Sequence, residues 1–193
     1  LENMPQKVFV DANILVSRTI LDWLFALQIL SGDMFVFYTS QDVLAETVRA
    51  LRRKHPTAPG RIIKDRVEKI GAVMEEIIDD FPGDMPFDGL DRHDYHVHAA
   101  AFASQADIIL TDNSPQDITI TASEQRYEIM NADAFLMLIR DSAPNLVIEC
   151  TSQQLEYWQK RKGFQGLDDA LRRAGCDNFA SAVREALQAL AQR

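Results

Sequence analysis

The sequence predicts an α/β protein, in which a parallel sheet is flanked by helices as an α/β/α sandwich, with a helical extension at the C-terminus. Short apolar runs alternate with helix-length amphipathic stretches up to about residue 145, and such alternation is typical of a parallel sheet. Beyond Asn145 the pattern is helical throughout. The 193 residues, 47% of them hydrophobic, are enough to bury a core. We therefore expect an α/β domain at residues 5–145 and a helical extension at residues 146–193.

The strands and helices of the α/β domain follow from its hydrophobic periodicity. Short runs rich in β-branched and aromatic residues predict strands at 8–10, 34–38, 108–110 and 127–130. Helical spacing of apolar residues predicts helices at 14–30, 41–54, 61–80, 94–105 and 133–140. Ser40 is expected to cap the second of these helices, Pro82-Gly83 to stop the third, and Pro144 to close the last. Residues 84–92 are expected to form a loop.

The C-terminal extension predicts three successive helices, at 152–162, 167–174 and 178–192. Gly163 and Gly175 stand just past two of the helix ends, where glycine is the usual C-cap. Phe179, Val183 and Leu187 follow each other at i, i+4 and i+8 and form an apolar stripe. Packing within the protein is the expected role of this stripe, and contact with a partner or with a nucleic acid are the alternatives.

Charge is divided unevenly along the chain. Residues 1–150 hold 24 acidic residues against 13 Lys and Arg, whereas residues 151–193 hold 5 against 7. This balance argues against binding a nucleic acid by bulk positive charge. A local exception, at residues 49–69, has eight basic residues against two acids, and it is either a solvated helical face or a strip that steers a polyanion. The contact candidates in it are Arg49, Arg52, Arg53 and Lys54.

The sequence favours a cytoplasmic protein that does not enter a membrane. No run of ~18 apolar residues is present, and the start lacks the pattern of a signal peptide. Cys150 and Cys176 are too few for a disulfide framework and lack metal-ligand spacing, so we expect buried free thiols.

Acidic residues follow or flank the predicted strands. Asp11 and Asn13 come directly after the first strand, and Asp94 lies in the first turn of its helix. In open α/β folds, ligands bind beyond the carboxyl ends of the strands. We therefore expect a binding site there, with helix capping as the alternative role for Asp11. The third predicted strand leads in the same way into Thr111, Asp112, Asn113 and Asp117.

Three further polar residues have weaker support from spacing. Glu46 lies nearly opposite the apolar stripe of its helix, beside Arg49 and Arg53, and spacing alone favours a solvated side chain. Thr39 and Ser40 end the second strand and are candidates for hydrogen bonds to ligands or phosphate. A role in the turn and the helix cap is at least as good an explanation for both hydroxyl groups.

Four segments occur in order along the chain: VFVDANILVS, YTSQDVLAETVRAL, DYHVHAAAFASQADIILTDN and a following QDI. Together they resemble the motifs of PIN domains, the metal-dependent ribonuclease fold of VapC-type toxins in bacterial toxin–antitoxin pairs. The resemblance covers about residues 7–142 and implies a PIN-like sandwich, Mg²⁺ or Mn²⁺, and hydrolysis of RNA. By this resemblance Asp11, Glu46 and Asp94 take the places of the first three metal-binding acids.

The fourth acid departs from the family pattern. Asn113 stands where most members have Asp, and Asp112 and Asp117 are the two replacements that the chain offers. Acids gathered in one pocket repel each other unless a hard cation neutralises them. Such a cation also lowers the pKa of a bound water, which can then attack a phosphate. If one ion binds, Thr111 and Asn113 are expected to position water. The departure motivates an alternative, a catalytically impaired PIN-like module that binds RNA or protein.

The resemblance also implies partners. VapC-like proteins are typically held by a VapB-like or other antitoxin whose Arg-bearing tail enters the acid cluster, and many form homodimers. Other kinds of site fare worse. A zinc site built from His93, His96, His98, Asp91 and Asp94 lacks a second cluster of ligands. An aspartyl-phosphate site would need a second Asp at position 13, and no Gly-rich phosphate loop is present.

Overall fold

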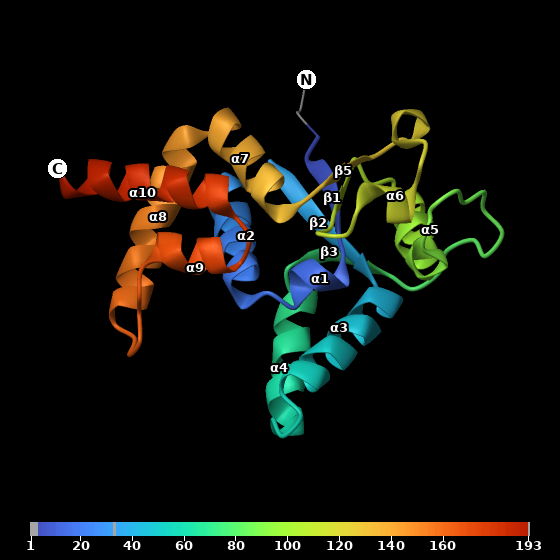
Figure 1. The fold of residues 1–193 in the computed structure, drawn as a ribbon, viewed down its shortest axis with the longest axis horizontal. Helices are drawn as coiled ribbons and strands as arrows, with labels where there is room; N and C mark the ends of the chain where they lie inside the picture. Colours follow the sequence, from blue (N-terminus) through green and yellow to red (C-terminus); the bar gives the residue numbers. More distant parts are fainter. Residues whose placement is uncertain (1–3, 33, 193) are drawn as a thin grey trace. The chain divides into compact units, whose positions relative to one another are not determined.

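The computed structural model describes residues 4–32 and 34–192, which divide into two compact units (Figure 1). The unit that we call the sheet unit comprises residues up to 16 together with 34–130. The helical unit comprises residues 17–32 and 131–192. These units differ from the predicted division, because the helices at 18–31 and 132–142 group with the C-terminal helices. Residues 5–145 and 146–193 as separate domains stay a prediction.

The sheet unit is built on five parallel strands in the order β3-β2-β1-β4-β5. Val8 on the central strand pairs with Phe37 on one side and Ile108 on the other. Its side chain is fully buried, as expected for a parallel strand covered on both faces. The predicted fold class, a parallel sheet flanked by helices with further helices at the C-terminus, is confirmed. The strands are β1 (Gln6–Val10), β2 (Phe35–Ser40), β3 (Met74–Ile78), β4 (Ile108–Leu110) and β5 (Glu128–Met130).

The helices of the sheet unit follow the strands. Helix α3 has the predicted bounds, and Ser40 caps it by accepting a hydrogen bond from the Val43 N–H at 3.2 Å. Helix α3 packs against β2 and α4, and α5 packs against β2. The helices are α1 (Ala12–Leu15), α3 (Gln41–Lys54), α4 (Gly60–Gly71), α5 (Tyr95–Ala103) and α6 (Pro115–Ile118), with 3₁₀ turns η1 (Arg92–Asp94) and η2 (Ala122–Glu124).

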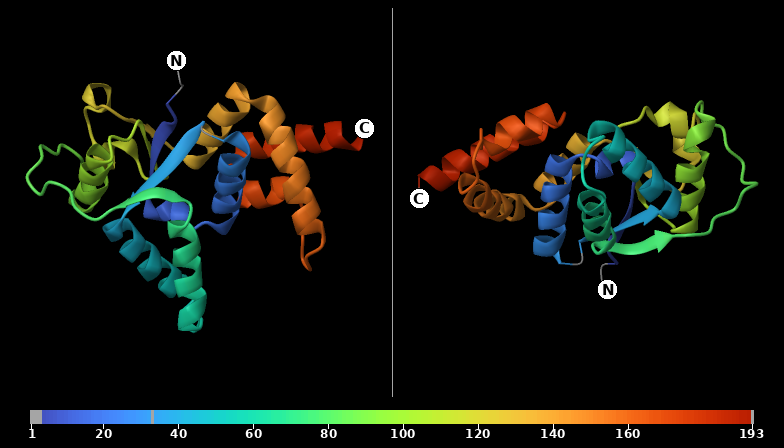
Figure 2. Two further views of the ribbon diagram at one scale, coloured as in Figure 1. Left: turned by 180° about the vertical axis from the view of Figure 1, so that it is seen from behind. Right: turned by 90° about the horizontal axis from the view of Figure 1, so that it is seen from below.

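The predicted helix at 61–80 is wrong in its second half. Helix α4 ends at Gly71, and the chain then returns to the sheet as β3, a path that Figure 2 shows. Glu75 and Glu76 are exposed on this edge strand and gave the segment a helix-like composition, while Ile77 and Ile78 pair with β2. Pairing with a neighbouring strand overrode local propensity, and exposed charge is usual on an edge strand.

The predicted helix at 14–30 is two helices. Helix α1 ends at Leu15, and α2 (Arg18–Ser31) begins after Ser17, whose side chain accepts from the Ile20 N–H at 3.3 Å. Ser17 has an extended backbone conformation, so the helix breaks there. The apolar spacing continues across this break, which is why periodicity did not reveal it.

The helical unit consists of α2, α7 (Ala132–Ser142), α8 (Pro144–Gln159), α9 (Leu167–Arg173) and α10 (Asp177–Ala191). Trp23 of α2 packs edge-to-face on Phe179 of α10, with ring centroids 5.1 Å apart. Helix α10 also packs against α7, α8 and α9, so its apolar stripe is part of this unit's core. Gly175 has a positive φ just past the end of α9, as expected of a helix C-cap, whereas Gly163 also has a positive φ but does not cap α8, which ends at Gln159 with Lys160 as its C-cap.

One boundary in the helical unit was predicted wrongly. Helix α8 starts at Pro144, eight residues before the predicted start at Ser152. Pro144 was taken as the end of the preceding helix, but proline is also favoured in the first turn of a helix, where its missing N–H is not needed.

The cysteines are free and buried, as expected. Burial raises the pKa of the Cys150 thiol to about 12, so little thiolate forms near neutral pH. In residues 4–32 and 34–192, no helix has both the length and the apolar character needed to cross a membrane.

Candidate functional site

Asp11 is fixed at the carboxyl end of the central strand. Its backbone N–H donates to the Leu110 carbonyl at 3.0 Å, which ties it to the end of β4. Its carboxylate caps α1 by accepting from the Ala12 N–H at 2.6 Å. The residue is only 3% exposed. The capping role considered from the sequence is therefore present, but one carboxylate oxygen is left for other partners.

That second oxygen accepts from a polar side chain just after β4 and from one on α1. Thr111 donates its hydroxyl to Asp11 Oδ2 at 2.7 Å, and Asn13 Nδ2 donates to the same oxygen at 3.2 Å. Burial raises the pKa of the Asp11 carboxyl, and the hydrogen bonds from Thr111 and Ala12 only partly oppose this effect. Asp11 is thus a carboxylate whose charge the surrounding protein neutralises poorly.

Asp94 lies where η1 passes into α5, and its side chain is half-buried. Its pKa is raised to about 6, first by desolvation and then by the negative charge of Asp11, with smaller contributions from Asp91 and Asp117. A hydrogen bond from Asn113 opposes the shift. Asp11, 83 positions earlier in the sequence, therefore lies close enough to Asp94 for its negative charge to disfavour ionisation of Asp94.

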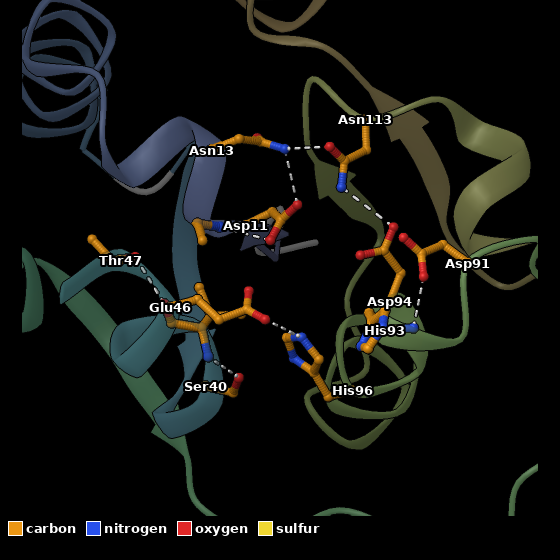
Figure 3. Close-up of polar contacts among 12 residues, drawn as sticks. Asp11, Asn13, Ser40, Glu46, Thr47, Asp91, His93, Asp94, His96 and Asn113 are labelled. Atoms are coloured by element: carbon orange, nitrogen blue, oxygen red, sulfur yellow. Dashed lines mark hydrogen bonds and ion pairs between the residues drawn. The ribbon is translucent and has the colours of Figure 1, made fainter. Parts of the chain in front are cut away.

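Two asparagine amides link these acids. Asn113 Nδ2 donates to Asp94 Oδ2 at 3.3 Å, and Asn113 Oδ1 accepts from Asn13 Nδ2 at 3.0 Å. Asn13 also donates to Asp11 and to the Thr111 hydroxyl. The chain Asp11, Asn13, Asn113, Asp94 is visible in Figure 3. We call it the amide bridge. Asn113, which stands at the fourth-acid position of the family pattern, is therefore part of this cluster and contributes an amide instead of a carboxylate.

Glu46 extends from α3 toward the same region (Figure 3). Its carboxylate is 3.2 Å from His96 Nε2, two residues after Asp94, and half of the Glu46 side chain is exposed. The pairing with Arg49 and Arg53 that helix spacing favoured is not the one observed. Glu46 thus contacts a histidine of α5 that follows Asp94 by two positions, and its role as a metal ligand stays a prediction.

Asp112 and Asp117 are both near the cluster. The Asp112 N–H donates to Asn13 Oδ1 at 3.1 Å, and the charge of Asp112 contributes to the raised pKa of Asp11. The charge of Asp117 contributes to the raised pKa of Asp94. Each acid is thus associated with a different member of the pair, and the choice between them as a fourth ligand stays open.

The hydroxyl groups of Thr39 and Ser40 have structural partners. Thr39 is fully buried and donates to the Val10 carbonyl at 3.0 Å, while Ser40 caps α3. This geometry fits the turn and cap roles better than contact with a ligand.

The basic candidates lie on α3. Arg52 donates to the carbonyl groups of Pro56 and Ala58, so it holds the turn after the helix. The exposed candidates are Arg49, Arg53 and Lys54.

The histidines of α5 do not form a zinc site. His98 is buried and its Nδ1 lies 2.6 Å from the Tyr127 hydroxyl, and His96 is engaged by Glu46. Among the described residues, no group of three or more His, Cys, Asp or Glu side chains is placed to hold a metal ion.

The fold and this site define a class of protein: an α/β protein with a cluster of carboxylates and amides at the carboxyl edge of a parallel sheet. The chain belongs to the PIN-domain family, because residues 7–114 match the model of the PIN domain. Membership indicates a nuclease-type function. Neither the curated proteins nor the solved structures that were compared with the chain gave a match.

Divalent metal is typical of this family, and the donors present here suit it. Asp11, Asp94 and Glu46 contribute carboxylate oxygens and the amide bridge contributes carbonyl oxygens, which are the ligands that Mg²⁺ and Mn²⁺ prefer. Mg²⁺ commonly binds through one or two carboxylates and keeps several waters, so a ready group of three acids is not required. Burial raises the pKa of Asp11, and burial together with the charge of Asp11 raises that of Asp94, so the two acids mark a place where positive charge is missing.

Sequence reasoning missed two features of this cluster. It assigned His96 only to a rejected zinc site, although His96 contacts Glu46 across 50 positions of sequence. It also treated Asn13 and Asn113 separately, whereas their amides join across 100 positions. No local spacing encodes either contact, because each depends on the arrangement of two distant segments in the fold.

Proposed function

We propose that the protein is a divalent-metal-dependent endoribonuclease, the VapC-like toxin of a type II toxin–antitoxin pair. The observation that supports this most is the pair Asp11 and Asp94, whose pKa values are both raised and which share one hydrogen-bonded cluster. A carboxylate whose pKa is raised by burial, beside a second whose pKa is raised by burial and by the charge of the first, is costly to the fold near neutral pH. Such an arrangement is expected where a cation is to bind.

Asp11, Asp94 and Glu46 would hold the metal, with Asn113 and one of Asp112 and Asp117 nearby. When bound, Mg²⁺ or Mn²⁺ would lower the pKa of the water that attacks the phosphate and would offset negative charge on the phosphoryl oxygens. The protein's own contribution is orientation. Thr111 and Asn13 fix the Asp11 carboxylate, and His96 restrains Glu46.

Charge on α3 fits a role in attracting the substrate. Arg49, Arg53 and Lys54 are exposed on the helix that carries Glu46. In a unit with 19 acidic residues and 11 Lys and Arg, these side chains offer an RNA phosphate local positive charge. The RNA would thus approach over α3 toward the carboxylates.

An acidic pocket of this kind also fits an inhibitor with a basic tail. A guanidinium group matches a carboxylate in geometry and charge, so we propose that a cognate VapB-like or other antitoxin occupies the cluster, and that the chain forms a homodimer. Purification from the native host should recover a small protein with an Arg-bearing segment. Recovery of the chain alone would contradict the proposal that an antitoxin binds it. A cytoplasmic location stays a prediction.

Asn113 leaves one alternative, a PIN-like module that binds RNA or protein without cleaving. The raised pKa values favour the nuclease, because a binding module would gain nothing from two poorly neutralised acids. Cleavage decides between them.

The test is cleavage of a structured RNA by the purified chain with Mn²⁺, with and without chelator. Asp11→Asn and Asp94→Asn should each lower the rate at least ~100-fold, since a metal contributes several kcal/mol to transition-state stabilisation. The control Asp84→Asn removes the same charge from an exposed loop of the sheet unit and should leave the rate unchanged. Cleavage that persists in chelator and in both site variants would contradict the proposal.

A further inference from the structure

The end of α8 carries a cluster of arginine and aromatic side chains that the site in the sheet unit does not use. Arg161 lies over the Tyr157 ring, with its Cζ 4.2 Å from the ring centroid, and also hydrogen-bonds the Tyr157 hydroxyl. The Trp158 ring has guanidinium groups near it from Arg18, at 5.2 Å, and from Arg161, at 5.5 Å. We call Arg18, Tyr157, Trp158 and Arg161 the stacking cluster. Each of these contacts is of cation–π type.

A cavity of about 190 Å³ adjoins the stacking cluster within the helical unit. Its lining residues come from α2, the end of α8, the segment that follows and α9. Its walls include aromatic rings and two cationic side chains: Trp23, Trp158, Phe164, Lys162 and Arg173. The volume is smaller than the ~300–1,000 Å³ of pockets for drug-sized ligands, which suits a single planar ring.

The charge around the cavity favours an anionic ligand. The cationic side chains at or beside it are Arg18, Arg161, Lys162 and Arg173. Its one acidic wall residue, Asp22, lies 3.8 Å from Arg18 in an ion pair. Arg161 and Lys162 are exposed. This local excess of positive charge occurs in a chain with a net charge of −9.

Two aromatic side chains in this region are partly accessible to a ligand. Tyr157 is 49% exposed and Trp158 is half-buried, and the two rings meet edge-to-face at 5.4 Å. The Trp158 indole N–H already donates to Gln154, so its ring is held in place. Aromatic side chains beside cationic groups are the combination that binds single-stranded nucleic acid, because bases stack on the rings while Arg and Lys contact phosphates.

We infer that the stacking cluster and the adjoining cavity form a binding site for single-stranded RNA, with a base against Tyr157 or Trp158 and phosphates at Arg161 and Lys162. The inference rests on the proposed function only in taking RNA as the ligand. It adds a second, non-catalytic site that holds an unpaired segment of the substrate. An acidic protein segment would satisfy the charges but not the exposed rings.

The test uses the full chain carrying Asp11→Asn, in chelator, with a fluorescein-labelled 12-nucleotide single-stranded RNA as probe. Arg161→Gln should weaken binding at least ~5-fold and reduce the salt slope of the binding constant by about 0.7, the value for one phosphate contact. Tyr157→Ala should weaken binding at least ~5-fold, consistent with loss of one stacked base. Arg140→Gln, which removes the same charge from α7 of the same unit, should change neither quantity.

Tryptophan fluorescence reports on stacking directly. The chain has two tryptophans, and Trp23 is only 2% exposed, so quenching by RNA is expected to come from Trp158. Trp158→Phe should abolish the quenching while the emission of Trp23 remains, and thermal melting should show that the variant is folded.

Three outcomes would overturn the inference: binding that neither Arg161→Gln nor Tyr157→Ala weakens, equal binding of duplex RNA, or tighter binding of a poly-glutamate peptide than of RNA. Cleavage by the unmodified chain is a separate measurement. Loss of cleavage in the Asp11 and Asp94 variants with unchanged RNA binding would support both proposals, whereas cleavage that ignores those variants would overturn only the nuclease mechanism.

Discussion

The two units of this protein differ in what their charged residues do. Residues 1–16 and 34–130 hold 19 acidic residues against 11 Lys and Arg, whereas residues 17–32 and 131–192 hold nine against eight, so the negative charge is concentrated in the sheet unit. In the sheet unit, Asp11 and Asp94 are brought together with raised pKa values. In the helical unit, the partly buried Asp168 pairs with Arg184 at 3.0 Å. The sheet unit thus holds two acids whose charge is poorly neutralised, whereas the helical unit pairs its buried acid with an arginine.

This contrast separates residues that stabilise the fold from residues that are placed for function. The helical unit follows the ordinary rule that a buried charge is paired and that apolar side chains fill the core. The sheet unit obeys the same rule in its strands but breaks it at their carboxyl ends. Such local departures from consistency are expected at functional sites.

The largest effect is expected from breaking the core of the helical unit. Trp23→Ala removes a nearly fully buried indole from its contact with Phe179, and it should lower the free energy of unfolding by about 3–5 kcal/mol. Ile29→Ala on the same helix is the control, because Ile29 is 76% exposed and its loss should cost less than about 0.5 kcal/mol. Urea unfolding followed by circular dichroism measures both. Equal effects would show that Trp23 is not a core residue.

A smaller effect is expected in the loop that supports the acids. A Cβ on Gly89 would lie 2.3 Å from the Asp117 carbonyl oxygen and 2.7 Å from that of Ile118, so the backbone must move. Gly89→Ala should therefore destabilise the protein by about 1–3 kcal/mol. It should also reduce cleavage, since the neighbouring Asp91 N–H donates to the Asp117 carbonyl at 3.2 Å.

The control for this change is Gly83→Ala, in the same loop, where a Cβ meets nothing within 4 Å and φ is not positive. It should be neutral or slightly stabilising. Thermal unfolding and the cleavage assay on both variants make the comparison. A harmless Gly89→Ala would mean that this segment does not position the acids.

The smallest effect is a pH dependence that distinguishes the acids of the cluster from ordinary carboxylates. The folded-state pKa of Asp94, about 6, lies above the ordinary value of 3.8, so the folded protein binds the proton more tightly than the unfolded chain. The contribution of Asp94 to stability is therefore present below pH 4 and is lost as pH rises through 6. Because the group is partly solvated, we expect about 1 kcal/mol.

Chemical denaturation of the metal-free protein between pH 4 and 7.5 measures this contribution. Asp94→Asn should remove this pH-dependent loss of stability. The free energy of unfolding of the variant should therefore rise relative to that of the unmodified chain as pH rises. Asp88 supplies the opposite sign, because hydrogen bonds from Thr121 and Thr119 lower its pKa and its contribution is lost as pH falls. A difference between Asp94→Asn and the unmodified chain that does not vary with pH would contradict the raised pKa.

The sequence allowed prediction of those features that a single segment determines. The strand at 8–10, the helix at 41–54 with its Ser40 cap, and the placement of Asp11 at a strand end all depend on local patterns, and the structure has them. Strand β3 was missed because its identity depends on pairing with β2 rather than on its own residues. The site was predictable as a gathering of strand ends, since parallel strands align their carboxyl ends. The contacts within it were not, because Glu46 meets His96 only through the packing of the fold.

The amide bridge separates the carboxylates of Asp11 and Asp94 in the metal-free protein. Each asparagine offers a donor to one neighbour and an acceptor to another, so the two negatively charged groups are spaced by neutral hydrogen-bonding partners rather than left facing each other. An aspartate at position 113 would lose the N–H that now reaches Asp94 and would add a further negative charge. The asparagine at position 113 therefore limits the repulsion among these carboxylates in the metal-free protein.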